Sequence, residues 1–234
     1  MNIFDDLYLL FQPIVNTEST MDFIEFEVLL RNHETKSFPE SLFTKLMNDE
    51  DLYINYLYWF HKEMKKYLDA FPQYNFSLNL FPSQINKEAT WEFLNELKPY
   101  SSQIMIEITE HIKPFQKQSD HMNDQIDMEF YLVKINQLGY QIALDDISTG
   151  QNNLEFVLKN IDHIDTMKFT LTAFMDAKME DVRDFIYAWR QVSIRHGKRF
   201  IIEGVENEDI SKRLSDSGFT YQQGYYWPLI KDMY

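Results

Sequence analysis

Apolar and polar residues follow two different rhythms along this chain. Short apolar or alternating runs, rich in β-branched and aromatic residues, predict strands. These strands are expected at 7–15, 23–31, 75–81, 103–111, 142–145, 163–170, 199–206 and 219–226. Longer segments with apolar residues at helical spacing predict helices between most of them. The helices are expected at 41–71 (two helices, stopped by Pro72), 91–98, 128–138, 153–159, 174–196 and 209–217.

Strands that alternate with helices predict a parallel sheet, and near-continuous apolar strands predict burial on both faces of that sheet. Eight such units in 234 residues favour an α/β fold closed as a (β/α)8 TIM-like barrel. A doubly wound sheet is less favoured because no glycine-rich phosphate loop follows the first strand. We expect one domain that spans residues 1–234.

Composition narrows the class of protein. The formal charge of −15 argues against binding to a nucleic acid polymer, since phosphate contacts need clustered lysine and arginine. The absence of cysteine excludes disulfides and thiolate metal sites and fits a reducing compartment. The first residues carry no signal-peptide pattern, and no apolar run approaches the roughly 18 residues of a membrane span. We therefore expect a cytoplasmic protein without a membrane span.

Polar side chains gather where the predicted strands end, which is where barrels of this kind place their chemistry. The residues at these ends are Glu27, Arg31, Asn79, Glu107, Glu110, Asp145, Asp146, Lys168, Glu203, Glu206 and Gln223. So many acids beside only two cations would repel one another strongly unless metal ions lie between them. Carboxylate and amide oxygens suit hard divalent ions such as Mg²⁺, Mn²⁺ or Ca²⁺.

Each of these residues could also have an ordinary structural role. The pair Asp145-Asp146 by itself fits a solvated turn that caps a helix, and Glu27 by itself fits a half-exposed strand. Lys168 by itself fits a salt bridge to a neighbour. Glu107 is harder to account for in this way, because it interrupts the apolar run Ile-Met-Ile-Glu-Ile and must point into the core or the barrel. Taken together, the residues indicate a metal-loaded active site.

Eight short motifs occur in order and at matching spacings. They are FQPIV (11–15), EVLLR (27–31), NLF (79–81), IEITE (106–110), DDISTG (145–150), KFT (168–170), EGVE (203–206) and QGYY (223–226). With these motifs the whole chain resembles an EAL domain, the cyclic di-GMP phosphodiesterase module of bacteria. The resemblance implies a barrel of the EAL type whose first strand is antiparallel.

The resemblance also implies a site with two metal ions, Mg²⁺ or Mn²⁺, whereas Ca²⁺ should bind but inhibit. The implied ligands of the first ion are Glu27, Asn79, Glu107 and Asp145, and those of the second are Asp145, Asp146 and Glu203. The implied reaction is hydrolysis of one phosphodiester bond of cyclic di-GMP to linear pGpG. A two-metal site suits this chemistry, since it activates water and neutralises the developing charge. A homodimer is compatible with the resemblance.

Other residues have implied roles around the substrate. Lys168 would lie beside the attacked phosphate and water, and Gln223 would orient water or metal. Gln12 and Arg31 would contact the substrate, and Glu110 would anchor the loop after the aspartate pair.

The chain departs from the family pattern at several places, without losing an implied metal ligand. The departures are Val28, Phe81, Ile147, Ser148, Gln151–Asn153, Thr170 and two residues missing between Tyr226 and Pro228. Thr170 stands where a supporting aspartate is usual. A catalytically silent cyclic di-GMP receptor is therefore an alternative to the enzyme.

A glycosidase is a further alternative from the barrel alone. In it, Glu107 or Glu110 would act with Glu203, after strands four and seven. Such a two-carboxylate mechanism has no role for Asp145-Asp146 or Lys168.

Overall fold

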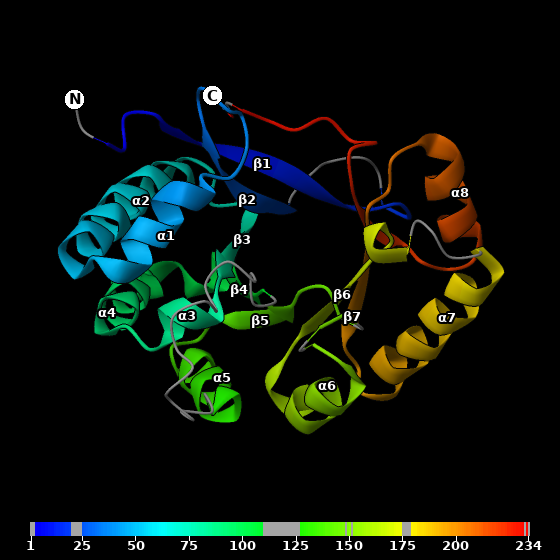
Figure 1. Cartoon of the computed structure of the whole chain (residues 1–234). Helices are drawn as coiled ribbons and strands as arrows, with labels where there is room; N and C mark the ends of the chain where they lie inside the picture. The colour runs from blue at the N-terminus through cyan, green and yellow to red at the C-terminus, as the bar shows by residue number, and fades with distance from the viewer. Residues whose placement is uncertain are drawn as a thin grey trace.

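Eight strands close into a barrel in the order β1-β2-β3-β4-β5-β6-β7-β8 (Figure 1). The computed structural model describes residues 3–19, 25–109, 127–147, 149–150, 152–174, 179–231 and 233. The strands are β1 (Leu7–Asn16), β2 (Glu25–Asn32), β3 (Asn75–Leu80), β4 (Ile104–Ile108), β5 (Gln141–Leu144), β6 (Thr166–Thr170), β7 (Arg199–Glu203) and β8 (Tyr221–Gln223). The predicted TIM-like barrel is thus confirmed.

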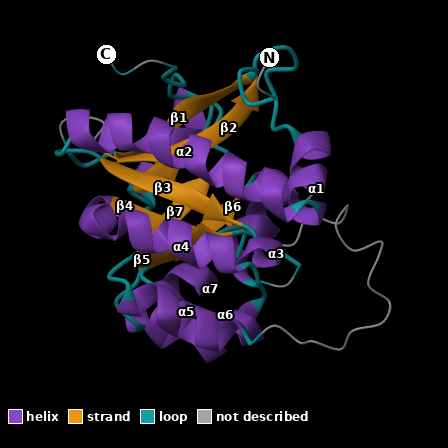
Figure 2. Ribbon diagram, turned by 90° about the vertical axis from the view of Figure 1, so that its left-hand side faces the viewer, coloured by secondary structure: helices purple, strands orange, loops and turns teal. Residues whose placement is uncertain are grey.

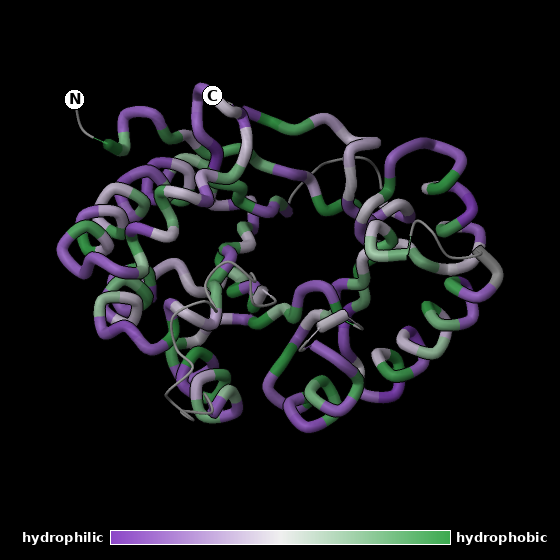
Figure 3. The backbone as a smooth tube through the Cα atoms, in the orientation of Figure 1, coloured by the Kyte–Doolittle hydropathy of each residue, from purple (hydrophilic) through white to green (hydrophobic). Residues whose placement is uncertain are grey.

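Helices surround the strands, as Figure 2 shows from the side. They are α1 (Glu40–Asn48), α2 (Glu50–Ala70), α3 (Pro82–Ile85), α4 (Glu88–Leu97), α5 (Met128–Gln137), α6 (Leu154–Asn160), α7 (Met179–Arg195) and α8 (Glu208–Asp216). The described connections also contain the short 3-10 helices η1 (Lys98–Gln103), η3 (Ile161–His163) and η4 (Thr172–Phe174). Apolar and polar positions alternate along the outer helices (Figure 3), as amphipathic helices require. Within the described ranges, no helix combines the length and the apolar character that a bilayer crossing needs.

The first strand runs against its neighbours. β1 is antiparallel to both β2 and β8, whereas all the other strand pairs are parallel. The register places Gln12 opposite Glu27 and Ile14 opposite Gln223. The antiparallel first strand implied by the family resemblance is therefore confirmed, and it brings Gln12 level with the candidate site.

Several predicted strands are longer than those observed. The strand expected at 163–170 begins only at Thr166, because His163 ends η3 and Ile164 and Asp165 connect η3 to β6. The strand expected at 199–206 ends at Glu203, because Gly204 turns the chain with a φ of +77°. Of the strand expected at 103–111, Gln103 belongs to η1 and β4 ends at Ile108, and residues 110–111 lie outside the described residues. The strand expected at 219–226 is confined to Tyr221–Gln223. The helix expected at 174–196 begins at Met179, and α3 was not predicted.

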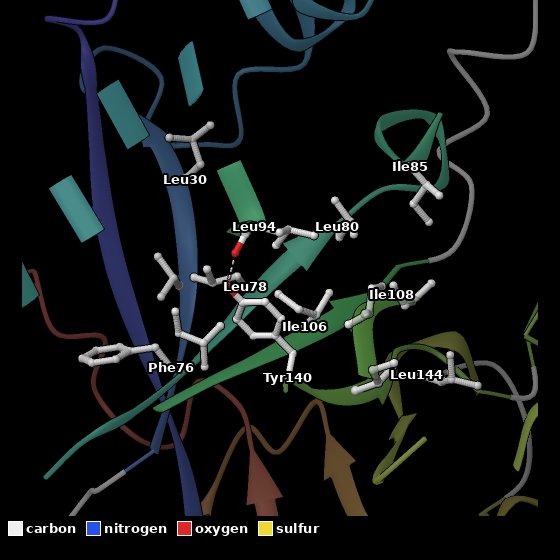
Figure 4. Close-up of a cluster of buried hydrophobic side chains, with 14 of the residues drawn as sticks. Leu30, Phe76, Leu78, Leu80, Ile85, Leu94, Ile106, Ile108, Tyr140 and Leu144 are labelled. Carbon is white, nitrogen blue, oxygen red and sulfur yellow. Dashed lines mark hydrogen bonds between the residues drawn. The ribbon is translucent and has the colours of Figure 1, made fainter. Parts of the chain in front are cut away.

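The outward faces of the strands and the inward faces of the helices form the main core (Figure 4). Phe76 and Leu94 are almost completely buried there, and burying such a side chain contributes about 1.5–3 kcal/mol. Tyr140 joins the same cluster, and its hydroxyl donates to the carbonyl of Leu94 at 2.6 Å. This hydrogen bond ties the start of β5 to α4 and satisfies the polar end of a buried aromatic residue.

A polar plug fills the N-terminal end of the barrel. Arg199 of β7 reaches across the lumen and binds both carboxylate oxygens of Glu25 at 2.6 Å each. Its Nε also donates to the hydroxyl of Thr166 at 3.2 Å. This bidentate ion pair occupies the lower lumen, so the strand-end residues at the opposite mouth remain for chemistry.

Candidate active site

A buried lysine lies at the centre of the barrel mouth. The side chain of Lys168 is 0% exposed, and its Nζ lies 2.8 Å from Glu203 Oε1, 3.3 Å from Glu27 Oε2 and 3.7 Å from Asp145 Oδ1. It also donates a hydrogen bond to Glu107 Oε1. One cation therefore faces four carboxylates from four different strands or strand ends.

Strand register explains why these residues meet. In the parallel pairs, Asn79 lies opposite Glu107, and Thr170 lies opposite Glu203. Lys168 comes two residues before Thr170 on the same face of β6, one layer deeper in the barrel. Its long side chain can therefore rise from below to the level of the carboxylates.

Two amides hold the carboxylate of Glu27 in place. Asn79 Nδ2 donates to Glu27 Oε1 at 2.8 Å, and Gln223 Nε2 donates to Glu27 Oε2. Gln223 also donates to Gln12 Oε1 at 3.0 Å. These bonds orient Glu27 from both sides and connect β1, β2, β3 and β8 across the mouth.

The two adjacent aspartates are brought to the same side by an unusual backbone conformation. Within a regular strand, neighbouring side chains point to opposite faces. Asp146 instead has a φ of +46°, in the left-handed region that aspartate tolerates better than most residues. Its carbonyl accepts a hydrogen bond from the hydroxyl of Thr149 at 2.7 Å, and Ile147 N donates to the carbonyl of Lys168 at 3.0 Å. The turn therefore lets Asp145 and Asp146 approach a shared position.

Burial and charge shift the pKa values of this cluster. Burial raises the pKa of Glu107 well above its usual range, and the neighbouring charge of Glu27 adds to this increase. Burial likewise raises the pKa of Glu203 well above its usual range, although Lys168 opposes the increase.

For Lys168 and Glu27, the neighbouring groups outweigh the effect of burial on the pKa. Burial alone would lower the pKa of Lys168, but the surrounding carboxylates outweigh burial and raise it well above its usual range. Burial would raise the pKa of Glu27, yet the charge of Lys168 and the bonds from Asn79 and Gln223 lower it overall. The lysine is therefore held in its charged form, and two of the acids lack enough positive charge nearby to ionise easily.

The donor atoms suit divalent metal ions. Two groups of carboxylates each bring ligand atoms within 4.8 Å of one another, namely Glu27, Glu107 and Glu203, and Asp145, Asp146 and Glu203. Glu107 Oε2 and Asp145 Oδ1 are buried and accept no hydrogen bond within the described part of the chain. Buried carboxylate oxygens without a donor are costly unless a cation satisfies them. All-oxygen donors of this kind match Mg²⁺ or Mn²⁺.

Of the predicted site residues, Arg31 lies apart from the cluster, and the structure does not describe Glu110. Arg31 lies four residues beyond Glu27 on β2, about 13 Å along the strand, and its Nη1 donates to the carbonyl of Leu30 at 2.9 Å. In the described ranges it forms no ion pair with the carboxylates. Glu110 lies outside the described residues.

Sequence reasoning missed one supporting residue. Asn152 is 3% exposed, and its side chain donates to the carbonyl of Asp145 at 2.6 Å. The adjacent Asn153 caps α6 through Phe156 N, a role that its position before an apolar helical run signals. The sequence contains no comparable signal for the bond of Asn152, because that bond depends on how the loop folds back.

Comparison with known proteins identifies the family of this chain. The family model for the EAL domain matches residues 4–228. The chain belongs to the EAL domain family. The cyclic di-GMP phosphodiesterase TpdA of Vibrio parahaemolyticus is 27% identical over 232 residues, which are 96% of this chain and 37% of TpdA. The chain thus spans well under half the length of this curated EAL relative.

Solved EAL structures share the fold. The PaMucR phosphodiesterase in complex with c-di-GMP is 23% identical and covers 97% of this chain and 92% of its own, with a TM-score of 0.73. BlrP1 of Klebsiella pneumoniae, solved with calcium and c-di-GMP, is 20% identical, with a TM-score of 0.72. The match covers 95% of this chain and 55% of the BlrP1 chain. A second BlrP1 complex contains manganese and c-di-GMP. At these identities the likeness shows the fold alone.

Proposed function

We propose that this EAL domain hydrolyses one phosphodiester bond of cyclic di-GMP to linear pGpG, with two divalent ions, Mg²⁺ or Mn²⁺. The observation that carries the proposal is that the barrel mouth holds two sets of three acidic residues, and that Glu203 belongs to both sets. Two neighbouring groups with one common ligand suit a site in which two cations act on one phosphate. The relative TpdA, which is named as a cyclic di-GMP phosphodiesterase, supports the choice of substrate.

The residues would divide between the two ions as follows. The ligands of the first would be Glu27, Asn79, Glu107 and Asp145, and those of the second Asp145, Asp146 and Glu203. Bound there, the ions would supply Lewis acidity and a water activated for attack on phosphorus. To serve as a ligand through its oxygen, Asn79 would keep its Nδ2 on Glu27, as observed.

The remaining side chains would bind and orient the substrate. Lys168 would present its fixed ammonium to the attacked phosphate, where negative charge accumulates during the displacement. The amide of Gln223 would orient the attacking water, since its Oε1 is buried and accepts no hydrogen bond in the described structure. Gln12 lies beside it and would contact the substrate, with Arg31 farther out along the same wall. Water would add to phosphorus, and one P–O bond of the ring would break to leave a phosphate at one end and a hydroxyl at the other.

The direct test uses the purified chain and cyclic di-GMP. The protein and cyclic di-GMP are incubated together with Mg²⁺, with Mn²⁺ or with EDTA, and the nucleotides are then separated by chromatography. We expect pGpG with either metal and unchanged substrate with EDTA. Product formation in excess EDTA would contradict a metal-dependent reaction.

A silent receptor is the second candidate, and the buried Thr170 favours it where a supporting carboxylate is usual. Equilibrium dialysis with radiolabelled cyclic di-GMP distinguishes the two. Binding without pGpG at any metal concentration would identify a receptor. A protein that neither binds nor cleaves cyclic di-GMP would refute both proposals.

A further inference from the structure

We propose that Thr172 is a positioning residue, which fixes Glu203 at the point where the two carboxylate groups meet. The inference rests on the proposed function, because it concerns how strongly the site holds divalent ions. Thr172 begins η4, two residues after the last residue of β6, and does not belong to the carboxylate cluster itself.

The end of β6 holds the backbone of Glu203 from the side of β7 that faces β6. Thr170 lies opposite Glu203 in the β6–β7 pair, and Leu171 N donates to the carbonyl of Glu203 at 3.0 Å. The hydroxyl of Thr170 is bonded to the hydroxyl of Thr172 at 2.7 Å. This hydrogen bond closes the turn after β6. The backbone N–H of Leu171, which donates to Glu203, therefore lies between two residues whose hydroxyls are bonded to each other.

Thr172 also packs against the residue that follows Glu203. A Cβ added to Gly204 would lie 2.9 Å from Thr172 Cγ2 and 3.3 Å from Thr172 N. Gly204 has a φ of +77°, which glycine adopts without strain. The methyl group of Thr172 therefore occupies the space beside the turn through which the chain leaves Glu203.

The turn after Glu203 is held on its other side by β8. Val205 N donates to the carbonyl of Gln223 at 3.1 Å, and Tyr226 N donates to the carbonyl of Val205 at 3.0 Å. With Thr172 on one side and these bonds on the other, the backbone of Glu203 has little room to move.

Threonine supplies two groups that this place uses. Thr170 is only 7% exposed, so its hydroxyl needs the partner that Thr172 provides. The methyl group of Thr172 supplies the contact with Gly204. Since Glu203 belongs to both carboxylate groups, loss of its fixed position would weaken both candidate metal positions together.

The test measures Mn²⁺ binding without substrate, by isothermal titration calorimetry on the whole chain. T172V keeps the shape of the side chain but removes its hydroxyl. The double variant T170V/T172V removes both hydroxyls, so no buried hydroxyl loses its partner and the fold should survive. We expect both variants to bind Mn²⁺ about 10-fold more weakly, the lower end of the range for residues that orient metal ligands.

T90V is the matched control. Like Thr170, Thr90 of α4 is buried, and its hydroxyl is bonded to the carbonyl of Gln84 in α3 at 2.7 Å and to the hydroxyl of Tyr53 in α2 at 2.8 Å. It should lower the thermal midpoint and leave Mn²⁺ affinity unchanged.

The outcomes separate the two proposals. Wild-type affinity in T170V/T172V, or an equal loss in T90V, would overturn the role of Thr172 and leave the proposed function intact. A wild-type protein that binds no Mn²⁺ would overturn both.

Discussion

Lys168 Nζ lies 2.8 Å from Glu203 Oε1. Glu203 is the residue that the two sets of three acidic side chains at the barrel mouth have in common. The lysine is fully buried, so its charge is balanced by protein groups and not by bulk water. Its ammonium is the only cation within salt-bridge distance of the cluster among the described residues. This relationship makes the lysine important for the stability of the fold as well as for the proposed reaction.

Lys168→Met should strongly destabilise the metal-free protein. It leaves the four acidic side chains around it without a counter-charge, and breaking a buried ion pair in this way costs about 3–5 kcal/mol. Mn²⁺ should restore part of the loss, because cations bound at the carboxylates replace the missing charge. Urea unfolding with and without Mn²⁺ measures both effects. Equal stability of the variant and the wild type in EDTA would show that the lysine does not balance the cluster.

Glu27→Gln should abolish hydrolysis while the barrel stays folded. The amide keeps the shape of the side chain and can still accept from Asn79, but it loses the negative charge that a metal ligand needs. Initial rates of pGpG formation, together with circular dichroism, give the readout.

Glu25→Gln is the matched control on the same face of β2. It weakens the ion pair with Arg199 at the opposite end of the barrel. Thermal stability should fall, whereas hydrolysis below the melting transition should persist. Residual hydrolysis by Glu27→Gln comparable to that of Glu25→Gln would remove Glu27 from the site.

Calcium should bind at the site but not support cleavage. Ca²⁺ accepts longer and less regular coordination than Mg²⁺ and polarises its ligands more weakly. We expect Ca²⁺ to promote binding of cyclic di-GMP and to inhibit turnover with Mg²⁺ in a competitive manner. Parallel calorimetry and rate measurements test this, and Ca²⁺-supported rates equal to those with Mg²⁺ would be inconsistent with the prediction.

Thr170→Asp should lower the Mg²⁺ concentration needed for half-maximal rate. The new carboxylate would lie opposite Glu203 and could still accept a hydrogen bond from the hydroxyl of Thr172. A change of up to about 10-fold is expected for a residue that supports ligands without binding metal. Metal titrations of initial rate compare the two proteins. A midpoint that stays the same or rises would mean that the pair with Thr172 already provides this support.

The sequence by itself determined the order of strands and helices and the strand ends at which the candidate site lies. Hydrophobic periodicity is a local property, so β3, β5 and α5 could be located from their own residues within one or two positions. Glu107 could be placed inside the barrel in the same way, because a charge in an otherwise apolar strand is too costly to bury without a polar partner. The antiparallel β1 and the assignment of individual roles came only from the family resemblance.

Tertiary structure alone decided how these residues meet. The left-handed turn at Asp146 and the bond from Asn152 to Asp145 depend on loop backbone that no periodicity describes. The central position of Lys168 depends on barrel closure, which brings β2, β4 and β7 around one side chain from β6. Closure and register are set by many weak contacts between segments far apart in the chain. For this reason the strand ends could be named from sequence, but their convergence on one lysine could not.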